Sequence, residues 1–317
     1  MKTTGHNYPL LSILIAVYNQ EKYVAETIES FFHQDYPNLE MIVIDDGSPD
    51  NSYAVAQTAA KNAPFKTTIL TQKNEGASKT FNKLGQMAKG ELLTFMGGDD
   101  VAIENTLMER AQIVLQNDKC MWCAGNGYFL RDTQKTEELM ASDREIEKIL
   151  TLSPAELHHN ATHNIVVAAY MYLQSMVLRK SLFDAIGGFD TDLLADDLVF
   201  GIKSYHYMAE NTYFCTGLKN PVFYYRIHDT NLHKNKPYIW QLYTQLADRY
   251  LENPKNLITR TGLAYYKYML RSQNRVFMRE VFLEIYKNPH THTATILLKT
   301  ILIFIRFSLK KFFSKNR

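Results

Sequence analysis

The feature that most constrains this chain is a regular alternation of apolar runs and helical segments in its first hundred residues. Four apolar runs lie at 10–18, 39–44, 67–70 and 91–96, with starts 24 to 29 residues apart. That spacing is the length of a βαβ unit, and such runs are typical of buried parallel strands. Asn19 is expected to cap the first intervening helix. We predict an α/β fold, a mostly parallel sheet flanked by helices, with ligands beyond the carboxyl ends of the strands.

The composition excludes several classes of protein. Of the 317 residues, 46% are hydrophobic and 21% are charged, which is a globular balance rather than a disordered one. The formal net charge of +2 is too small to indicate nucleic-acid binding across the surface. The first ten residues lack the apolar core of an export signal, and no apolar stretch reaches the roughly 20 residues of a membrane-spanning helix. With three cysteines, we expect a reducing, cytoplasmic location.

The pattern changes along the chain. We assign residues 1–236 to one α/β domain, in which the highly charged segment 131–148 is expected to be a solvated surface excursion. Residues 237–292 are rich in Tyr and Leu at helical spacing, which predicts a helical subdomain. Residues 293–317 form a basic tail with apolar residues over much of its predicted helix and no acidic residue. That tail favours a helix lying on an anionic membrane surface, and the alternative is a final helix packed on the protein.

Two clusters of potential metal ligands have simpler interpretations. Cys120 and Cys123 form a C-x-x-C within an apolar run, with no second pair, so we expect buried thiols rather than zinc or redox chemistry. His158, His159 and His163 lie close together, but no third-ligand pattern of Cys, Glu or Asp accompanies them. Surface or acceptor-contacting histidines are favoured over a zinc site.

Acidic residues follow two of the predicted strands. The second strand ends in Asp45 and Asp46, where a carboxylate can bind a base or ribose, or a turn and helix cap can form. The fourth strand ends in Asp99 and Asp100, and adjacent acids there are costly unless a cation compensates them. Mg²⁺ or Mn²⁺ uses few carboxylates and completes its shell with substrate phosphates. A metal and nucleotide-diphosphate site is therefore favoured over a helix cap at this second position.

At this point four blocks of sequence resemble the family 2 glycosyltransferases. These blocks are AVYNQEKYVAETIESFFHQDYPNLEMIVIDDGSPDNS, NEGASKTFNKLGQMAKGELLTFMGGDD, VLRKSLFDAIGGFDTDLLADDLVFGIK and PVFYYRIHDTNLH. They occur in the family's order over about residues 8 to 235. The resemblance implies the GT-A fold and the transfer of a sugar from a nucleotide diphosphate to an acceptor hydroxyl.

The resemblance also implies roles for individual residues. The metal would be bound by Asp99, with Asp100 beside it, and Asp197, in a third acidic pair with Asp196, would be the catalytic base. Alone, that third pair is equally compatible with a capped helix start. The residues implied to bind the donor are Val17, Tyr18, Asp46, Lys79, Asp99, Arg226 and His228.

The chain departs from the family pattern at three places. Gly97 replaces the usual first acid of the D-x-D motif, which leaves one fewer carboxylate for metal or ribose. Phe81 occupies the place of a frequent arginine, so Lys79 is expected to supply that positive charge. The third acidic pair is Asp-Asp where Glu-Asp is commoner, and this change keeps the base.

The resulting prediction is an inverting, metal-dependent transferase. We expect a UDP-sugar donor, Mn²⁺ or Mg²⁺ as cofactor, and a saccharide acceptor that is carried on a lipid, for surface-polysaccharide synthesis at the inner face of the cell membrane. The alternative from another class is a GT-A domain that has lost catalysis and serves as a scaffold at the membrane. A nucleotidyltransferase would need a glycine-rich phosphate loop after the first strand, which the sequence lacks.

Overall fold

The structure is a computed structural model, and it describes residues 8–300 except 164–171, 195–196, 230, 232–233, 253, 272–274, 290, 293–294 and 297–298. The chain divides into two compact units. The first ends at His228, and the second begins at Asp229 and also takes in Thr162 and His163. Within the described residues, no helix is long and apolar enough to cross a membrane.

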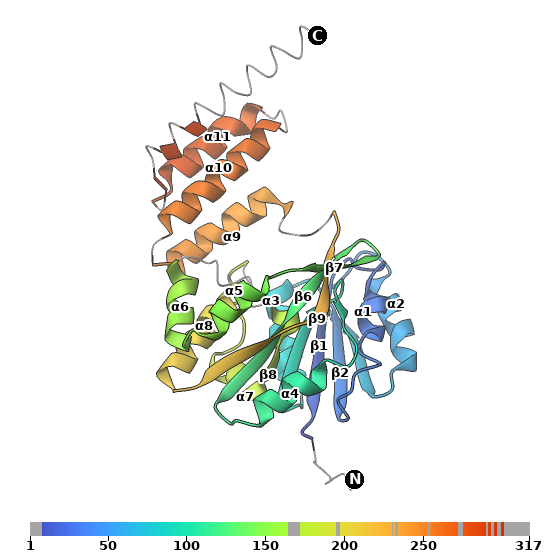
Figure 1. The fold of residues 1–317 in the computed structure, drawn as a ribbon. Helices are drawn as coiled ribbons and strands as arrows, with labels where there is room; N and C mark the ends of the chain where they lie inside the picture. The colour runs from blue at the N-terminus through green and yellow to red at the C-terminus, as the bar shows by residue number, and fades with distance from the viewer. Residues whose placement is uncertain are drawn as a thin grey trace. The chain divides into compact units, whose positions relative to one another are not determined.

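The first unit is built on one mixed sheet (Figure 1). Its first four strands in sheet order β3-β2-β1-β4 are mutually parallel, which confirms the four predicted strands and the βαβ arrangement. All four are long enough for a strand and too short for a typical helix. These strands are β1 (Leu11–Val17), β2 (Leu39–Asp45), β3 (Lys66–Thr71) and β4 (Leu92–Gly97). Strands β1, β2 and β4 are largely apolar and buried, whereas β3, KTTILT, lies at the edge of the sheet and is partly exposed.

The sheet continues beyond β4 with a changed direction. Strand β8 pairs antiparallel with β4 and β6, β6 pairs in parallel with β9, and β5 and β7 pair antiparallel with β9 and β6 respectively. The long β9 returns the chain to the first half of the sheet, because its far end pairs with β5, directly after β4. The bounds are β5 (Val101–Ala102), β6 (Cys120–Arg131), β7 (Gln134–Leu139), β8 (Val177–Arg179) and β9 (Phe214–Ile227).

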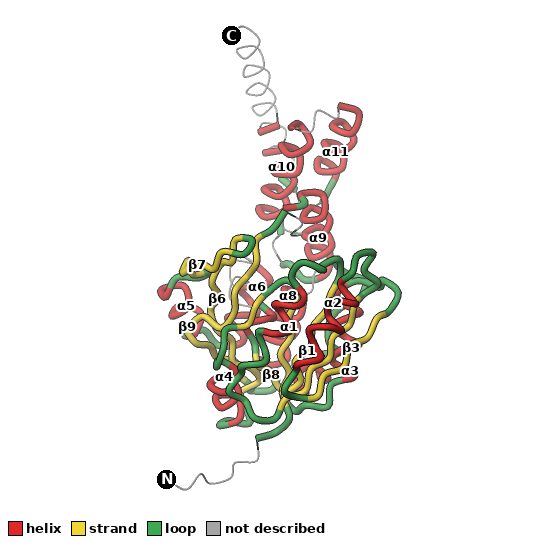
Figure 2. Tube along the Cα trace, turned by 90° about the vertical axis from the view of Figure 1, so that its right-hand side faces the viewer, coloured by secondary structure: helices red, strands yellow, loops and turns green. Residues whose placement is uncertain are grey.

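Helices surround the strands of this sheet (Figures 1 and 2). Successive side chains of a strand point to opposite faces, so each strand contributes to two cores. Met96 on β4 belongs to one buried cluster with residues of β1, α1, α2 and α4. Its neighbour Phe95 contacts a separate aromatic group, with ring centroids 5.6–5.7 Å from Phe81, Phe183 and Phe189. The helices are α1 (Val24–Glu29), α2 (Ser52–Ala59), α3 (Ala77–Met87), α4 (Leu107–Leu115), α5 (Asp143–Leu150), α6 (Pro154–His163), α7 (Lys180–Ala185) and α8 (Asp197–Glu210).

Two local predictions need correction. Asn19 does not cap α1: it has a φ of 57°, its backbone N–H donates to Ser48 Oγ at 2.8 Å, and the helix begins only at Val24. Asn tolerates this left-handed conformation, so it serves a turn instead. The charged segment 131–148 is folded rather than a simple excursion, because it contains β7 and most of α5, whose Ile146 is fully buried.

The cysteines are buried thiols, as predicted. Cys120 and Cys123 lie on β6 and have no exposed surface. Burial raises the pKa of Cys120 to about 11 and that of Cys123 to about 12. Both are free thiols, and at neutral pH they remain protonated and unreactive.

The second unit contains the helices α9 (Lys236–Arg249), α10 (Lys255–Arg271) and α11 (Arg275–Lys287), orange in Figure 1. Trp240 of α9 donates a hydrogen bond from Nε1 to Glu284 of α11 at 2.5 Å. His163 lies 3.3 Å from Glu252, whereas His158 contacts the ring of His206 in the first unit. The predicted tail lies outside the described residues from 301 onward, so its membrane role stays a prediction.

Candidate active site

The carboxyl ends of three parallel strands meet at one edge of the sheet. Strand β1 pairs with β2 on one side and with β4 on the other, so Val17 lies opposite Asp45 and Ala16 lies opposite Gly97. The segments that follow these strands therefore emerge together, and they carry both acidic doublets that the sequence singled out. In open α/β sheets this edge is where ligands bind.

The doublet after β2 is buried and holds a loop. Asp46 is 3% exposed, and its carboxylate accepts hydrogen bonds from Gln72 Nε2 at 2.7 Å and from the backbone N–H groups of Glu75 and Gly76 at 2.9 and 2.8 Å. Asp46 thus shapes the loop that leads into α3. Its neighbour Asp45 has one buried oxygen, Oδ1, without a hydrogen-bond partner among the described residues. A contact from Asp46 to a nucleobase stays a prediction.

The other residues expected around the donor base differ in exposure. Val17 is 1% exposed, and its side chain belongs to the core. The nucleobase contact implied for Val17 stays a prediction, and because its side chain is in the core, only its backbone lies at this edge. Tyr18 is 51% exposed and offers an aromatic face beside it. Lys79 is exposed on the first turn of α3, three residues after Gly76, the residue held by Asp46.

Asp99 and His228 form a partly exposed polar pair at this edge. Asp99 follows β4, His228 follows β9, and His228 Nε2 lies 3.0 Å from Asp99 Oδ2. The two side chains are 20% and 9% exposed. Adjacent ligands of an octahedral cation, with bonds of about 2.1 Å, also lie about 3.0 Å apart. A carboxylate and an imidazole at this spacing fit two corners of a divalent-cation shell, with the remaining corners available to diphosphate oxygens and water.

Gly97 affects the same pair. A Cβ atom added at Gly97 would lie 2.8 Å from Asp99 Oδ1, closer than real Cβ contacts come. A side chain at position 97, as in the usual D-x-D motif, would therefore require the Asp99 carboxylate to move. Groups of three or more His, Cys, Asp or Glu side chains that could hold a metal do not occur among the described residues. A metal here would depend on oxygen ligands from the donor.

Asp100 is placed differently from its neighbour. It is 4% exposed, and its two oxygens accept hydrogen bonds from Arg226 N–H at 2.9 Å and from Gln174 Nε2 at 2.7 Å. Burial, followed by the charge of Asp99, raises the pKa of Asp100 well above its ordinary value. The expectation that Asp100 is a metal ligand is not supported by this geometry, because its oxygens already hold β9 and the loop before β8.

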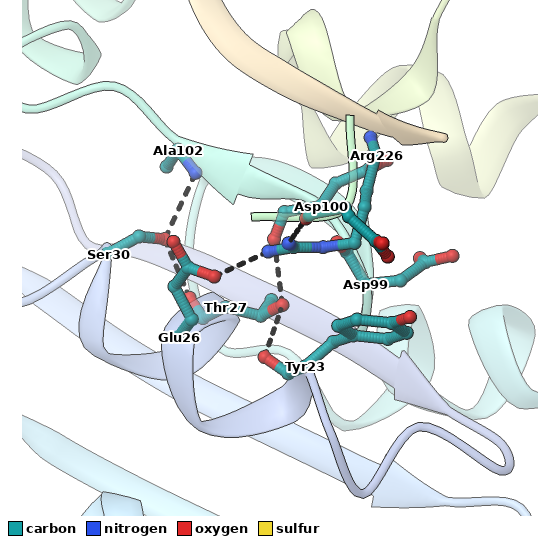
Figure 3. A network of polar contacts seen from close by, with 9 residues as sticks. Tyr23, Glu26, Thr27, Ser30, Asp99, Asp100, Ala102 and Arg226 are labelled. Atoms are coloured by element: carbon teal, nitrogen blue, oxygen red, sulfur yellow. Dashed lines mark hydrogen bonds and ion pairs between the residues drawn. The ribbon is translucent and has the colours of Figure 1, made fainter. Parts of the chain in front are cut away.

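Arg226 is a structural cation rather than one that closes over a diphosphate. Its side chain is fully buried. The guanidinium donates to Glu26 Oε2 at 2.5 Å, to the Asp99 carbonyl at 2.7 Å and to the Asp132 carbonyl (Figure 3). It also lies 4.7 Å from the centre of the Tyr23 ring. The predicted donor contact of Arg226 is not supported by this geometry, since its donors already have protein partners.

Tyr23 and Glu26 were not expected at the site. Both lie at the start of α1, and the Tyr23 ring stacks on His228 with centroids 5.2 Å apart. The block NQEKYVAE carries these residues, but a tyrosine and a glutamate on a predicted amphipathic helix are ordinary surface choices. Their partners lie about 200 residues further along the chain, so no local signal could identify them.

Asp197 is the first residue of α8. Its Oδ2 accepts a long hydrogen bond of 3.4 Å from Leu173 N–H, and Asp196 lies outside the described residues. Burial, followed by the nearby charge of Asp197, raises the pKa of the Tyr172 hydroxyl. A carboxylate at a helix N-terminus is stabilised in its ionised form by the helix dipole. Its role as base stays a prediction.

Curated proteins that are similar to this chain in sequence include glycosyltransferases. Glycosyltransferase GlyG of Streptococcus pneumoniae serotype 4 is 27% identical over 187 residues, which are 56% of this chain and 59% of GlyG. The uncharacterized glycosyltransferase EpsJ of Bacillus subtilis is 26% identical over 199 residues, 62% of this chain and 56% of EpsJ. The chain thus spans less than two thirds of the length of the curated relatives it matches.

Solved structures share the fold. The structure of S. aureus TarS 1-349 in complex with UDP aligns with a TM-score of 0.53 and 17% identity, covering 84% of this chain and 71% of TarS. The mannosyltransferase PcManGT from Pyrobaculum calidifontis, in complex with GDP-Man and Mn²⁺, aligns with a TM-score of 0.54 and 16% identity, covering 92% and 73%. These likenesses confirm the predicted GT-A fold. Residues 12–177, more than half of the chain, match the family model Glycosyl transferase family 2, and the chain belongs to that family.

Proposed function

We propose that this protein transfers a sugar from a nucleotide-diphosphate sugar to an acceptor hydroxyl with inversion. The observation that carries the proposal is the Asp99–His228 pair at the carboxyl edge of a family 2 sheet, 3.0 Å apart and partly exposed. Such a pair suits a divalent cation that is shared with a diphosphate. A bound cation would offset the negative charge that develops on the leaving diphosphate.

Asp197 is the proposed general base. In the proposed reaction the acceptor oxygen bonds to the anomeric carbon while the bond from that carbon to the diphosphate oxygen breaks. Asp197 takes the hydroxyl proton, which requires an ionised carboxylate. Its place at the N-terminus of the 14-residue α8 favours that ionised form.

The donor is proposed to be a UDP-sugar, with Mn²⁺ or Mg²⁺ as cofactor. The TarS structures with UDP and UDP-GlcNAc support uridine, whereas PcManGT, with GDP-Man and Mn²⁺, keeps guanosine in the test. Tyr18, exposed beside β1, is the proposed stacking face for the base, and the loop shaped by Asp46 lies next to it. Lys79 is the proposed cation near the diphosphate.

The acceptor is proposed to be a saccharide carried on a lipid at the inner face of the cell membrane. The basic, apolar segment 293–317 supports this, because such a helix binds anionic headgroups. In this proposal residues 1–236 catalyse and residues 237–292 connect them to the tail. Removing the chain after His292 should move the protein from the membrane fraction to the soluble fraction. Unchanged membrane recovery would contradict the proposed attachment.

The first experiment is a thermal-shift screen of UDP and GDP with and without Mn²⁺. Ligands that bind only the folded state raise its melting temperature, so a metal-dependent shift is expected with the correct nucleotide. Asp197→Asn should then abolish transfer and keep that shift, because the base does not contact the donor. Glu210→Gln, at the exposed far end of the same helix, is the matched control and should keep both.

A non-catalytic scaffold is the second candidate, and Gly97 is the observation that favours it, since one acid of the motif is missing. The two candidates differ in the same experiment. A nucleotide shift with turnover that depends on Asp197 supports the transferase. Turnover that is absent with every UDP- and GDP-sugar, in a protein that still binds membranes, supports the scaffold.

A further inference from the structure

The Tyr23 ring contacts the side chains of Arg226, near the end of β9, and of His228, which directly follows β9. The Arg226 guanidinium is 4.7 Å from its centre, and the His228 ring stacks on it at 5.2 Å. A cation over an aromatic face and a stacked imidazole are both favourable contacts. The Tyr23 ring therefore limits the directions in which His228 can turn, and His228 is one member of the proposed metal pair.

The other member of the pair, Asp99, is fixed through Arg226. Arg226 Nε donates a hydrogen bond to the Asp99 carbonyl at 2.7 Å, and this contact holds the backbone from which the Asp99 side chain projects. At the far end of the guanidinium, Nη2 donates a hydrogen bond to Glu26 Oε2 at 2.5 Å. The Arg226 side chain has no exposed surface. Figure 3 shows this chain of contacts running from α1 across to the end of β4.

Helix α1 is itself tied to the segment after β4. Thr27 Oγ1 donates to the Asp100 carbonyl at 2.7 Å, and Ala102 N–H donates to Ser30 Oγ at 3.0 Å (Figure 3). A helix of six residues would not be stable alone, so these tertiary contacts fix its place. Tyr23 and Glu26 are thus presented on a helix that is anchored to the same loop as Asp99.

We propose that Tyr23 and Glu26 are positioning residues for the metal: they hold His228 and Asp99 at the spacing that a divalent cation needs. This inference rests on the proposed function, because it concerns the metal of that reaction. Neither residue touches the cation. Tyr23 acts through His228, and Glu26 acts through Arg226 on the backbone of Asp99. Residues that orient metal ligands in this way typically change metal affinity about 10- to 100-fold when they are replaced.

The test is a titration of full-length protein with Mn²⁺ in the presence of UDP, followed by the electron paramagnetic resonance signal of free Mn²⁺. Tyr23→Leu removes the aromatic face, and Tyr23→Phe keeps it. Glu26→Gln removes the charge that fixes Arg226. Glu29→Gln is the matched control, an exposed glutamate three residues further along the same helix. Melting temperatures are measured for each variant, so that only folded protein is compared.

We expect Tyr23→Leu and Glu26→Gln to raise the Kd for Mn²⁺ about tenfold. Tyr23→Phe and Glu29→Gln should stay within about twofold of the wild type, since they keep the ring contacts and the Arg226 pair. Wild-type Kd values in both Tyr23→Leu and Glu26→Gln would overturn the positioning role and leave the proposed function intact. Failure of the wild type to bind Mn²⁺, or full binding by Asp99→Asn, would overturn the metal site and this inference with it.

Discussion

Replacing Arg226 by Met should destabilise the first unit and separate its structural role from any role toward the donor. Met fills much of the same volume but carries no donors. The change leaves the Asp99 and Asp132 carbonyls and the Glu26 carboxylate without their partner, and it removes the cation over Tyr23. Because Arg226 has no exposed surface, water does not replace these contacts without rearrangement.

The expected loss of stability depends on how well water can replace Arg226 at each of its former partners. Removing one member of a buried ion pair costs about 3–5 kcal/mol when the other charge is left buried. Glu26 is 45% exposed, however, so water solvates it, and that part of the loss lies well below this range. The part-buried Asp99 carbonyl loses its guanidinium donor at about 1–3 kcal/mol, and the lost cation–π contact adds about 1 kcal/mol. We expect a total of about 2–4 kcal/mol.

The assay is thermal unfolding followed by circular dichroism. A loss of about 2–4 kcal/mol corresponds to a fall in Tm of about 4–16 °C for a domain of this size. The control is Arg131→Met, which breaks another arginine–glutamate pair, with Glu138 at 2.6 Å, in which both side chains are more than half exposed. Such surface pairs contribute about 0–1 kcal/mol. Equal shifts in Arg226→Met and Arg131→Met would refute the assignment of Arg226 as a buried structural cation.

Three further predictions follow from local geometry. Gly85→Ala places a Cβ 2.4 Å from the Phe183 ring, so it should cost about 1–3 kcal/mol in chemical denaturation. Partial burial raises the pKa of Asp50, but hydrogen bonds from Ser52 and Glu21 N–H outweigh it and lower the pKa. The stability that the ionised Asp50 contributes is present above the unfolded-state pKa and is lost as pH falls through the folded-state pKa. Asp50→Asn should therefore lower the free energy of unfolding by about 1 kcal/mol at pH 7 and by less below about pH 4. Gly97→Ala should weaken Mn²⁺ binding with an unchanged Tm, because its Cβ displaces only the flexible end of Asp99.

The first half of the sheet could be predicted from the sequence because its signals are local. The run at 39–44 corresponds to β2, Leu39–Asp45, and the run at 91–96 to β4, Leu92–Gly97. Continuous apolar runs of this length report burial on both faces of a strand. The edge at which the acids gather follows from parallel pairing alone, so the place of the site was predictable as well.

The partners of the charged residues could not be predicted in the same way. Arg226 pairs with Glu26, which lies 200 positions earlier in the chain. A motif that contains an arginine and a histidine gives no sign that the arginine is buried and pairs with Glu26, whereas the histidine lies beside Asp99. The prediction that Asn19 caps a helix was wrong for a related reason. The turn that Asn19 adopts depends on Ser48, which only the pairing of β1 with β2 brings near.

The acidic doublet after β4 shows how adjacent acids come to have different surroundings. Asp99 lies in the turn after β4 and Asp100 directly follows that turn, so the two consecutive acids need not face one ligand together. After β4, Asp99 is partly exposed beside His228, whereas Asp100 is buried and holds Arg226 N–H. The buried member is costly, and its protein hydrogen bonds offset that cost. At this strand end Asp99 is therefore better interpreted as a candidate ligand and Asp100 as an anchor, and the anchor joins β9, which leads into His228, to the loop that carries Asp99.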